Sequence, residues 1–159
     1  MSALDKFDLA ILSTLQSDAR QSLAEVAGKA GLSPSPTWRR IRALEDAGVI
    51  ERQVAILNPH SVGLTVSAFV QVVLSDHSPA ARKLFEEFVA RDSRIVDCAT
   101  VTGKARYIMS VVARSAGELE HFINDGLLAT GVVRDASTEF VLRRVKRQTA
   151  LPLADANEA

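Results

Sequence analysis

The 159-residue chain has very little cysteine, because Cys98 is its single one. A single thiol excludes an internal disulfide framework and a cysteine-rich zinc site. No apolar run is long enough to cross a membrane, and no signal-peptide pattern follows Met1. We therefore expect a cytoplasmic protein with no membrane partner.

The chain also lacks an excess of charge, because 19 basic residues balance 19 acidic residues. This balance argues against a protein coated in positive charge, so any surface that binds nucleic acid must be local. The hydrophobic fraction is 47%, which is enough for a packed core and too much for a disordered chain. The length suits one domain or two small ones.

Patterns typical of catalysis and metal binding are missing as well. Asp76-His77-Ser78 contains the residue types of a hydrolase triad, but adjacent residues do not usually converge on one reacting atom. There is no Gly-x-Ser-x-Gly nucleophile elbow and no phosphate-binding glycine loop. The three histidines (His60, His77 and His121) lack metal-ligand spacing. We expect no enzyme, no catalytic residue, no metal site and no cofactor.

Residues 1–50 show the periodicity of three helices. In the first, apolar residues recur at steps of three and four: Leu4, Phe7, Ile11 and Leu15. The second begins with a capping box, in which Ser22 and Glu25 satisfy each other's backbone N–H groups. It ends at Gly31, where a helix C-terminus favours a left-handed residue.

The third helix begins with two prolines, in the stretch "GLSPSPTWRRIRALEDAGVI". We expect Ser33 to cap it and Pro34 to occupy its first position. Pro36 still lies in the first turn, where backbone N–H groups have no partner within the helix, so neither proline breaks a hydrogen bond. The prolines therefore form a rigid helix start.

Side chains on this third helix divide into two faces at about 100° per residue. The core side holds Thr37, Ile41, Leu44 and Gly48. The opposite half holds Ser35, Trp38, Arg39 and Arg42, with Arg40 on a flank. Two short helices whose second exposes basic residues near its N-terminus indicate a helix-turn-helix that binds double-stranded DNA. The alternative is a solvated amphipathic helix whose arginines pair with Glu45 and Asp46.

The residues that we expect to contact DNA are Ser33, Ser35, Thr37, Trp38, Arg39, Arg40 and Arg42. Four of them, Ser35, Trp38, Arg39 and Arg42, are expected to face the major groove. Arg40 and Thr37 are expected near the DNA backbone. The sequence does not indicate which arginine reads bases.

After Asn58-Pro59 the pattern changes to alternating strands and helices. The expected elements are a strand at 65–75, a helix at 80–89, strands at 95–102 and 107–113, a helix at 119–127 and a strand region at 132–145. This order is the ferredoxin-like βαββαβ plan. The predicted fold class is α+β, with a winged-helix-like helix-turn-helix domain at 1–50, a strand-like connector at 51–64, a ferredoxin-like domain at 65–146 and a loose tail at 147–159.

Two helices can cover only one face of a four-stranded sheet. The other face is expected to carry Phe69, Val73 and Val141. An apolar face of this kind suggests burial against a second copy of the chain, so we expect a homo-oligomer.

Five segments, in this order and spacing, carry a resemblance to a known family: "LDKFDLAILSTLQSDAR", "GLSPSPTWRRIRALEDAGVI", "NPHSVGL", "VTGKARY" and "GVVRDASTEFVLRRVKRQTALPL". From Leu4 to Leu153 the chain resembles the Lrp/AsnC family of bacterial and archaeal transcription factors. The resemblance implies a ligand-sensing ferredoxin-like domain that responds to amino acids. It also implies a homodimer formed through the sheet, which in many members assembles further into an octamer.

The resemblance places an effector site between subunits, at the turn that joins the middle strands. The residues implied are Thr102, Gly103, Lys104, Arg106 and Tyr107, with Ser137 and Thr138 nearby. Family members commonly have acidic residues where this chain has Lys104 and Arg106. We therefore predict a ligand with an extra carboxylate or without an ammonium group, or else an unliganded pocket. The alternative is that both cations point to solvent while backbone carbonyls hold the ammonium group of a neutral amino acid.

Together these observations predict a sequence-specific DNA-binding transcriptional regulator controlled by a small metabolite, an amino acid or a related carboxylate. The alternative is a small-ligand-binding or assembly protein without sequence-specific DNA readout. Fold alone does not exclude an enzyme, because small enzymes of ferredoxin-like fold exist.

Overall fold

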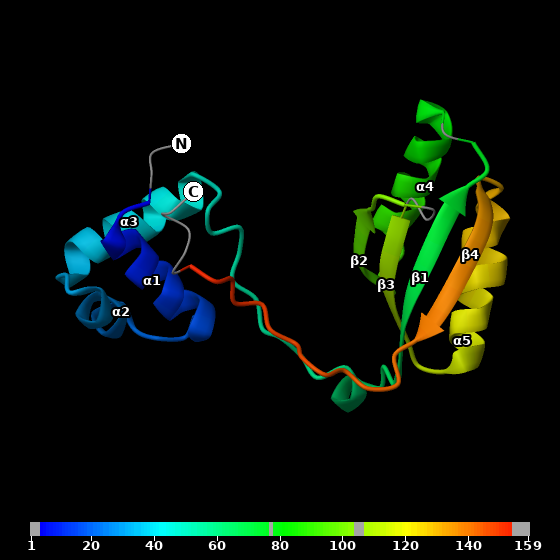
Figure 1. Cartoon of the computed structure of the whole chain (residues 1–159). Coiled ribbons are helices and arrows are strands. Elements are labelled where there is room, and N and C mark those ends of the chain that lie inside the picture. The colour runs from blue at the N-terminus through cyan, green and yellow to red at the C-terminus, as the bar shows by residue number, and fades with distance from the viewer. Residues whose placement is uncertain (1–3, 77, 104–106, 154–159) are drawn as a thin grey trace. The chain divides into compact units, whose positions relative to one another are not determined.

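A computed structural model describes residues 4–76, 78–103 and 107–153 of the chain. The chain divides into two compact units (Figure 1). The helical unit combines residues 1–55 with the C-terminal residues from 146 onward, and the sheet unit comprises residues 56–145. The polypeptide therefore passes twice between the units, once after residue 55 and once before residue 146.

The described residues of the helical unit form three helices: α1 (Lys6–Ser17), α2 (Leu23–Ala30) and α3 (Pro34–Asp46). The capping box predicted at the start of α2 is present, because the Ser22 N–H donates to Glu25 and the Glu25 N–H donates to the Ser22 hydroxyl. One apolar cluster holds the three helices together, and its buried members are Ile11, Val26, Ala30 and Leu44.

The turn between α2 and α3 depends on Gly31. Its φ of 68° lies in the left-handed region, and its N–H donates to the carbonyls of Ala27 and Gly28. The Leu32 N–H also bonds to the Ala27 carbonyl, at 2.9 Å. These bonds satisfy carbonyls at the end of α2 and set the direction in which α3 begins.

A pair of glycine substitutions tests this turn. Gly31→Ala should lower the free energy of unfolding by about 1 kcal/mol, because an L-residue is strained at positive φ. Gly28→Ala should raise it by about 0.5–1 kcal/mol, because Gly28 lies inside helix α2 and alanine favours a helix. A new Cβ would meet nothing within 4 Å at either position, so packing does not confuse the comparison. Urea denaturation measures both changes, and shifts of the same sign would contradict the assigned conformations.

Where the structure describes the sheet unit, it contains four strands: β1 (Val66–Leu74), β2 (Ile95–Thr100), β3 (Tyr107–Ala113) and β4 (Val133–Phe140). They pair antiparallel in the order β2-β3-β1-β4. Helix α4 (Pro79–Arg91) connects β1 to β2. Helix α5 (Ala116–His121) continues through a π-helical turn (Phe122–Leu127) and a 3-10 turn (Leu128–Thr130) before β4. The predicted βαββαβ order is confirmed.

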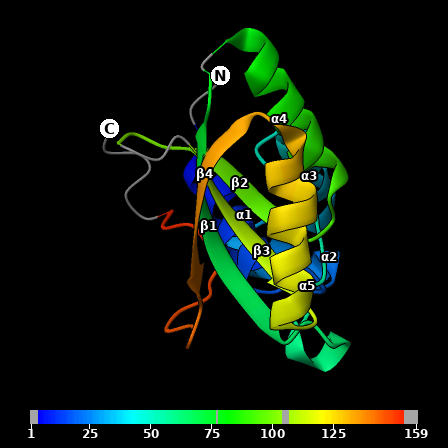
Figure 2. The same ribbon diagram turned by 90° about the vertical axis from the view of Figure 1, so that its right-hand side faces the viewer.

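Both helices lie on one face of the sheet (Figure 2). The buried side chains of β1 alternate as predicted, at Ala68, Val70, Val72 and Leu74. They pack with α4 and α5 through Phe85, Leu119, Phe122 and Leu127. The side chains between them on β1 point to the other face, where Phe69 is 40% exposed. This uncovered side is called the open face below.

Several segments differ from the predicted strands. Strand β4 ends at Phe140, so the strand region predicted to reach residue 145 is too long. Its last bond joins the Val141 N–H to the Ser67 carbonyl, and β1 begins only one residue earlier, at Val66. Beyond that point, residues 141–153 belong to no strand. Residues 51–57 also form no strand, although their sequence alternates in part.

The C-terminal segment is tied to α1 through a side-chain amide. Gln16 Nε2 donates to the Leu151 carbonyl and the Leu151 N–H donates to Gln16 Oε1, both at 2.9 Å. This pair of bonds explains why the residues from 146 onward group with the helical unit. The tail beyond residue 153 lies outside the described residues.

Candidate nucleic-acid interface and effector site

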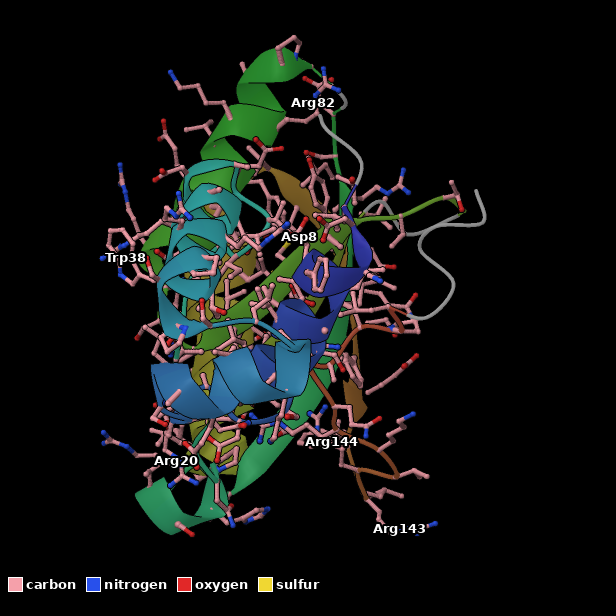
Figure 3. All side chains as sticks on the ribbon, turned by 90° about the vertical axis from the view of Figure 1, so that its left-hand side faces the viewer. Asp8, Arg20, Trp38, Arg82, Arg143 and Arg144 are labelled. Atoms are coloured by element: carbon pink, nitrogen blue, oxygen red, sulfur yellow. The ribbon has the colours of Figure 1, made fainter. Side chains whose placement is uncertain are left out.

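Helix α3 exposes the face that the sequence analysis assigned to DNA. Ser35, Trp38, Arg39 and Arg42 are all exposed. Trp38 is 52% exposed, and Figure 3 shows its side chain projecting away from the helical unit. The indole therefore offers a large apolar surface on the exposed side of α3.

Arg40 is turned towards α1 instead. Its Nη1 lies 2.8 Å from both Asp5 Oδ2 and Asp8 Oδ1, and its guanidinium lies 5.4 Å from the centre of the Phe7 ring. The hydrogen bond to Asp8, with a further one to Asp5, raises the pKa of Arg40. Arg40 therefore stays charged, but the two carboxylates balance its charge inside the unit. This pairing weakens the expectation that Arg40 contacts the DNA backbone.

The other two arginines of α3 differ in their surroundings. Arg42 pairs with Glu45 at 2.9 Å and lies 5.7 Å from the centre of the Trp38 ring. Arg39 is exposed, and within the described part of the chain no ion pair or side-chain hydrogen bond involves it. Arg39 is therefore the arginine of α3 whose donors are most available to a ligand.

Two residues at the start of α3 behave differently from expectation. Thr37 is completely buried and its hydroxyl donates to the Ser33 carbonyl at 2.9 Å, so its side chain does not reach the surface. Ser33 occupies the cap position, but its side chain makes no capping hydrogen bond. Such a bond goes to the N–H of the second or third helical residue, and the third is Pro36, which has none. The Ser33 hydroxyl is exposed.

The predicted effector turn is described only in part. Thr102 and Gly103 are exposed, and Gly103 has a φ of 113°, which favours glycine. Lys104 and Arg106 lie outside the described residues. Tyr107 is 4% exposed and belongs to the core, where its ring lies 4.5 Å from that of Phe85. Its hydroxyl donates to Glu86 Oε1 at 3.2 Å, and burial, together with Glu86, raises its pKa.

Ser137 and Thr138 point to opposite faces of the sheet. Thr138 is paired with Val70, a buried residue of the helix-covered face. Ser137 is paired with Gln71, whose side chain bonds to Glu139 on the open face. Residues directly opposite each other share a face, so only one of the two hydroxyls can line a given pocket. The exposed one is Ser137, on the open face.

Comparison with known proteins identifies the chain. Residues 67–151 match the Lrp/AsnC ligand binding domain, and residues 4–51 match a winged helix-turn-helix DNA-binding domain. The chain belongs to the Lrp/AsnC family. It is a transcriptional regulator with a helix-turn-helix and a C-terminal ligand-binding domain of ferredoxin-like fold, as the sequence analysis predicted.

Relatives of this Lrp/AsnC protein align over nearly its full length. The glutamate uptake regulatory protein of Zymomonas mobilis is 32% identical over 155 residues, covering 98% of this chain and 94% of the relative. The leucine-responsive regulatory protein of Escherichia coli is 32% identical over 148 residues, covering 93% and 90%. A transcriptional regulator of Neisseria meningitidis, solved as an L-methionine complex, superposes with a TM-score of 0.91 at 36% identity, covering 96% and 98%.

A hollow of about 360 Å³ lies beside α4 of this Lrp/AsnC chain, lined by Leu84, Glu87, Phe88, Arg91, Asp92 and Thr130. None of the predicted effector residues that the structure describes lines it. Across the described residues, no cluster of three metal-binding side chains occurs. Within the same ranges, no helix is long and apolar enough to span a membrane.

Sequence reasoning missed the carboxylates that hold two of the predicted site residues. Asp5 and Asp8 form a capping box of their own at the start of α1, a spacing that the sequence shows, but their reach to Arg40 is a tertiary contact. Glu86 on α4 accepts a hydrogen bond from the Tyr107 hydroxyl. The two residues are 21 positions apart in the sequence, so no local pattern indicates that pairing.

Proposed function

We propose that this regulator reads DNA sequence with the exposed face of α3. The observation that carries the proposal is the exposed pair of Trp38 and Arg39 on a helix matched by the DNA-binding family model. Ser35 and Arg42 share this face, and the Ser33 hydroxyl stands at its N-terminal end. We leave Arg40 out of the interface because it is paired with carboxylates of α1, and we leave Thr37 out because it is buried.

Arg39 is the residue that we assign to base reading. A guanidinium can donate two parallel hydrogen bonds to guanine O6 and N7, and a good pair contributes about 1–3 kcal/mol of discrimination. Arg42 is partly committed to Glu45, and its position against the Trp38 ring favours a role in holding that ring. Such a protein has no catalytic role and works in the cytoplasm with its DNA.

A specific observation also favours the second reading, an assembly or ligand-binding protein without sequence readout. Two of the three arginines of α3, Arg40 and Arg42, are already paired with carboxylates. Mobility shift on the DNA upstream of the protein's own gene separates the readings. The regulator should shift this fragment against excess competitor in a salt-dependent manner. An assembly protein should give no shift.

We further propose that the effector carries a carboxylate that pairs with Lys104 and Arg106, the two cations of the turn predicted from the sequence. The planar fork of arginine suits a carboxylate, whereas the ammonium group of an amino acid needs an acceptor. The name of the Zymomonas relative concerns glutamate uptake, and the Neisseria relative was solved with L-methionine. An acidic and a neutral amino acid are therefore both natural candidates to compare.

Calorimetry should distinguish these ligands. Glutamate or a 2-oxo acid should bind more tightly than leucine or asparagine, and Arg106→Asp should reverse the preference because it removes the cation and restores an acceptor. Arg134→Asp, an exposed change on β4, serves as the matched control and should leave the preference unchanged. Tight binding of a neutral amino acid that Arg106→Asp does not affect would contradict the charge argument.

A further inference from the structure

The DNA-reading domain carries little free positive charge of its own. Residues 1–50 contain six basic and six acidic side chains. Two of the basic ones, Arg20 and Arg40, pair with aspartates within the unit. A protein binds the DNA backbone mainly by neutralising phosphates with lysine and arginine. The α3 face alone therefore supplies few of the phosphate contacts that a regulator needs.

A second concentration of positive charge lies far away in the sequence. Residues 143–147, called the basic segment here, read Arg-Arg-Val-Lys-Arg and hold four cations in five positions. No acidic residue occurs between Glu139 and Asp155. Sheet pairing has ended at this point, and every residue from 142 to 150 is exposed. Figure 3 shows the Arg143 side chain extending into open space.

The basic segment crosses the division between the two units, because residues 143–145 belong to the sheet unit and residues 146–147 to the helical unit. Lys146 and Arg147 fall within that unit, and the chain is fixed to α1 four residues later by the two Gln16–Leu151 bonds. At its other end, the Val141 N–H donates to the Ser67 carbonyl, near the start of the inner strand β1. The segment is therefore a stretch of exposed chain without helix or strand, called the strap here, and it is held by hydrogen bonds on either side of it.

We infer that the basic segment is a second DNA-contacting element, which binds backbone phosphates while α3 reads bases. A strap with an exposed run of arginine and lysine suits a repeated line of phosphates and offers no shaped pocket for a base. It should therefore add affinity without adding sequence preference. The inference rests on the proposed function, because a strap of this kind is useful only if α3 docks on DNA.

The test is fluorescence anisotropy of the full chain on duplex DNA, with the variant Arg143→Gln/Arg144→Gln/Lys146→Gln. Arg147 is kept, because it has interactions within the structure. The control is Arg82→Gln/Lys83→Gln/Arg91→Gln, which removes the same charge from exposed positions on α4. Sedimentation and thermal melting of both variants verify that assembly and folding are unchanged.

The strap variant should bind both operator and unrelated DNA at least about 10-fold more weakly, with their ratio preserved. Because each phosphate contact contributes about 0.9 to the slope of log affinity against log salt, and a dimer carries the three cations twice, that slope should become shallower by up to about five. The control should keep the wild-type slope. A strap variant with an unchanged slope, on a wild-type protein that binds DNA, overturns this inference alone. A wild-type protein with no affinity for DNA overturns the proposed function as well.

Discussion

Arg39→Ala is expected to remove most of the preference for operator DNA while leaving most of the affinity for unrelated DNA. Arg39 is exposed on α3, and the described residues provide it with no ion pair. In a symmetric dimer the side chain acts once in each half-site. Two bidentate contacts of about 1–3 kcal/mol each correspond to a loss of specific affinity between about 30-fold and about 25,000-fold.

Arg20→Ala is the matched control. It removes the same charge from the same unit, but Arg20 is paired with Asp18 beyond the end of α1 and does not lie on α3 (Figure 3). Operator and competitor titrations of both variants at one salt concentration measure the effect. Unchanged operator affinity in both Arg39→Ala and Arg42→Ala would show that α3 is not the recognition helix.

Phe69→Asp is expected to convert the protein to a monomer of about 17 kDa. We propose that the open face is the homodimer interface, because Phe69 is 40% exposed there and both helices cover the opposite face. Obligate homodimer interfaces commonly bury about 2,000 Å² or more. A carboxylate at this position would be desolvated twice, once in each subunit. It would also lie directly opposite Glu139, where like charges repel.

Sedimentation equilibrium at micromolar concentration measures this change. Leu84→Asp is the control, because Leu84 is another exposed apolar residue, 54% exposed, on α4. The wild-type and Leu84→Asp proteins should sediment as dimers or as larger assemblies, including the octamer that the family resemblance implies. A wild-type monomer, or a Phe69→Asp protein of unchanged mass, would contradict the proposed interface.

Loss of the dimer should also weaken DNA binding. A dimer holds its second helix-turn-helix close to the second half-site, and such linkage commonly multiplies affinity by about 10²–10⁴. Phe69→Asp should therefore lower operator affinity without touching α3, whereas Arg39→Ala should leave the dimer intact. The two variants separate assembly from recognition.

Local patterns were sufficient for much of the fold. The alternation along β1 gave the buried face correctly, and the Ser22–Glu25 spacing located the start of α2. Both signals arise from neighbouring residues, whose spacing the sequence shows directly. The overrun of β4 has a different cause, because a strand ends where its partner ends, and β1 lies more than sixty positions earlier.

The candidate sites depended more on tertiary contacts. Helical periodicity placed Trp38 and Arg39 outward, and the structure agrees. It could not show that Arg40 would find two carboxylates on α1. The position of Tyr107 also depends on tertiary structure. The sheet register directs its side chain into the core, where its hydroxyl donates to Glu86. The residue type and the family motif do not show that the Tyr107 side chain points into the core.

The most direct test of the central claim is the affinity of the wild-type protein for two duplexes, measured by anisotropy at about physiological salt. One duplex carries the sequence upstream of the protein's own gene that the protein shifts, and the other carries the same bases in scrambled order. A regulator that reads sequence through α3 should prefer the first by about 10³-fold or more, and Arg39→Ala should remove most of that preference. Equal affinities of the wild-type protein for both duplexes would contradict the account.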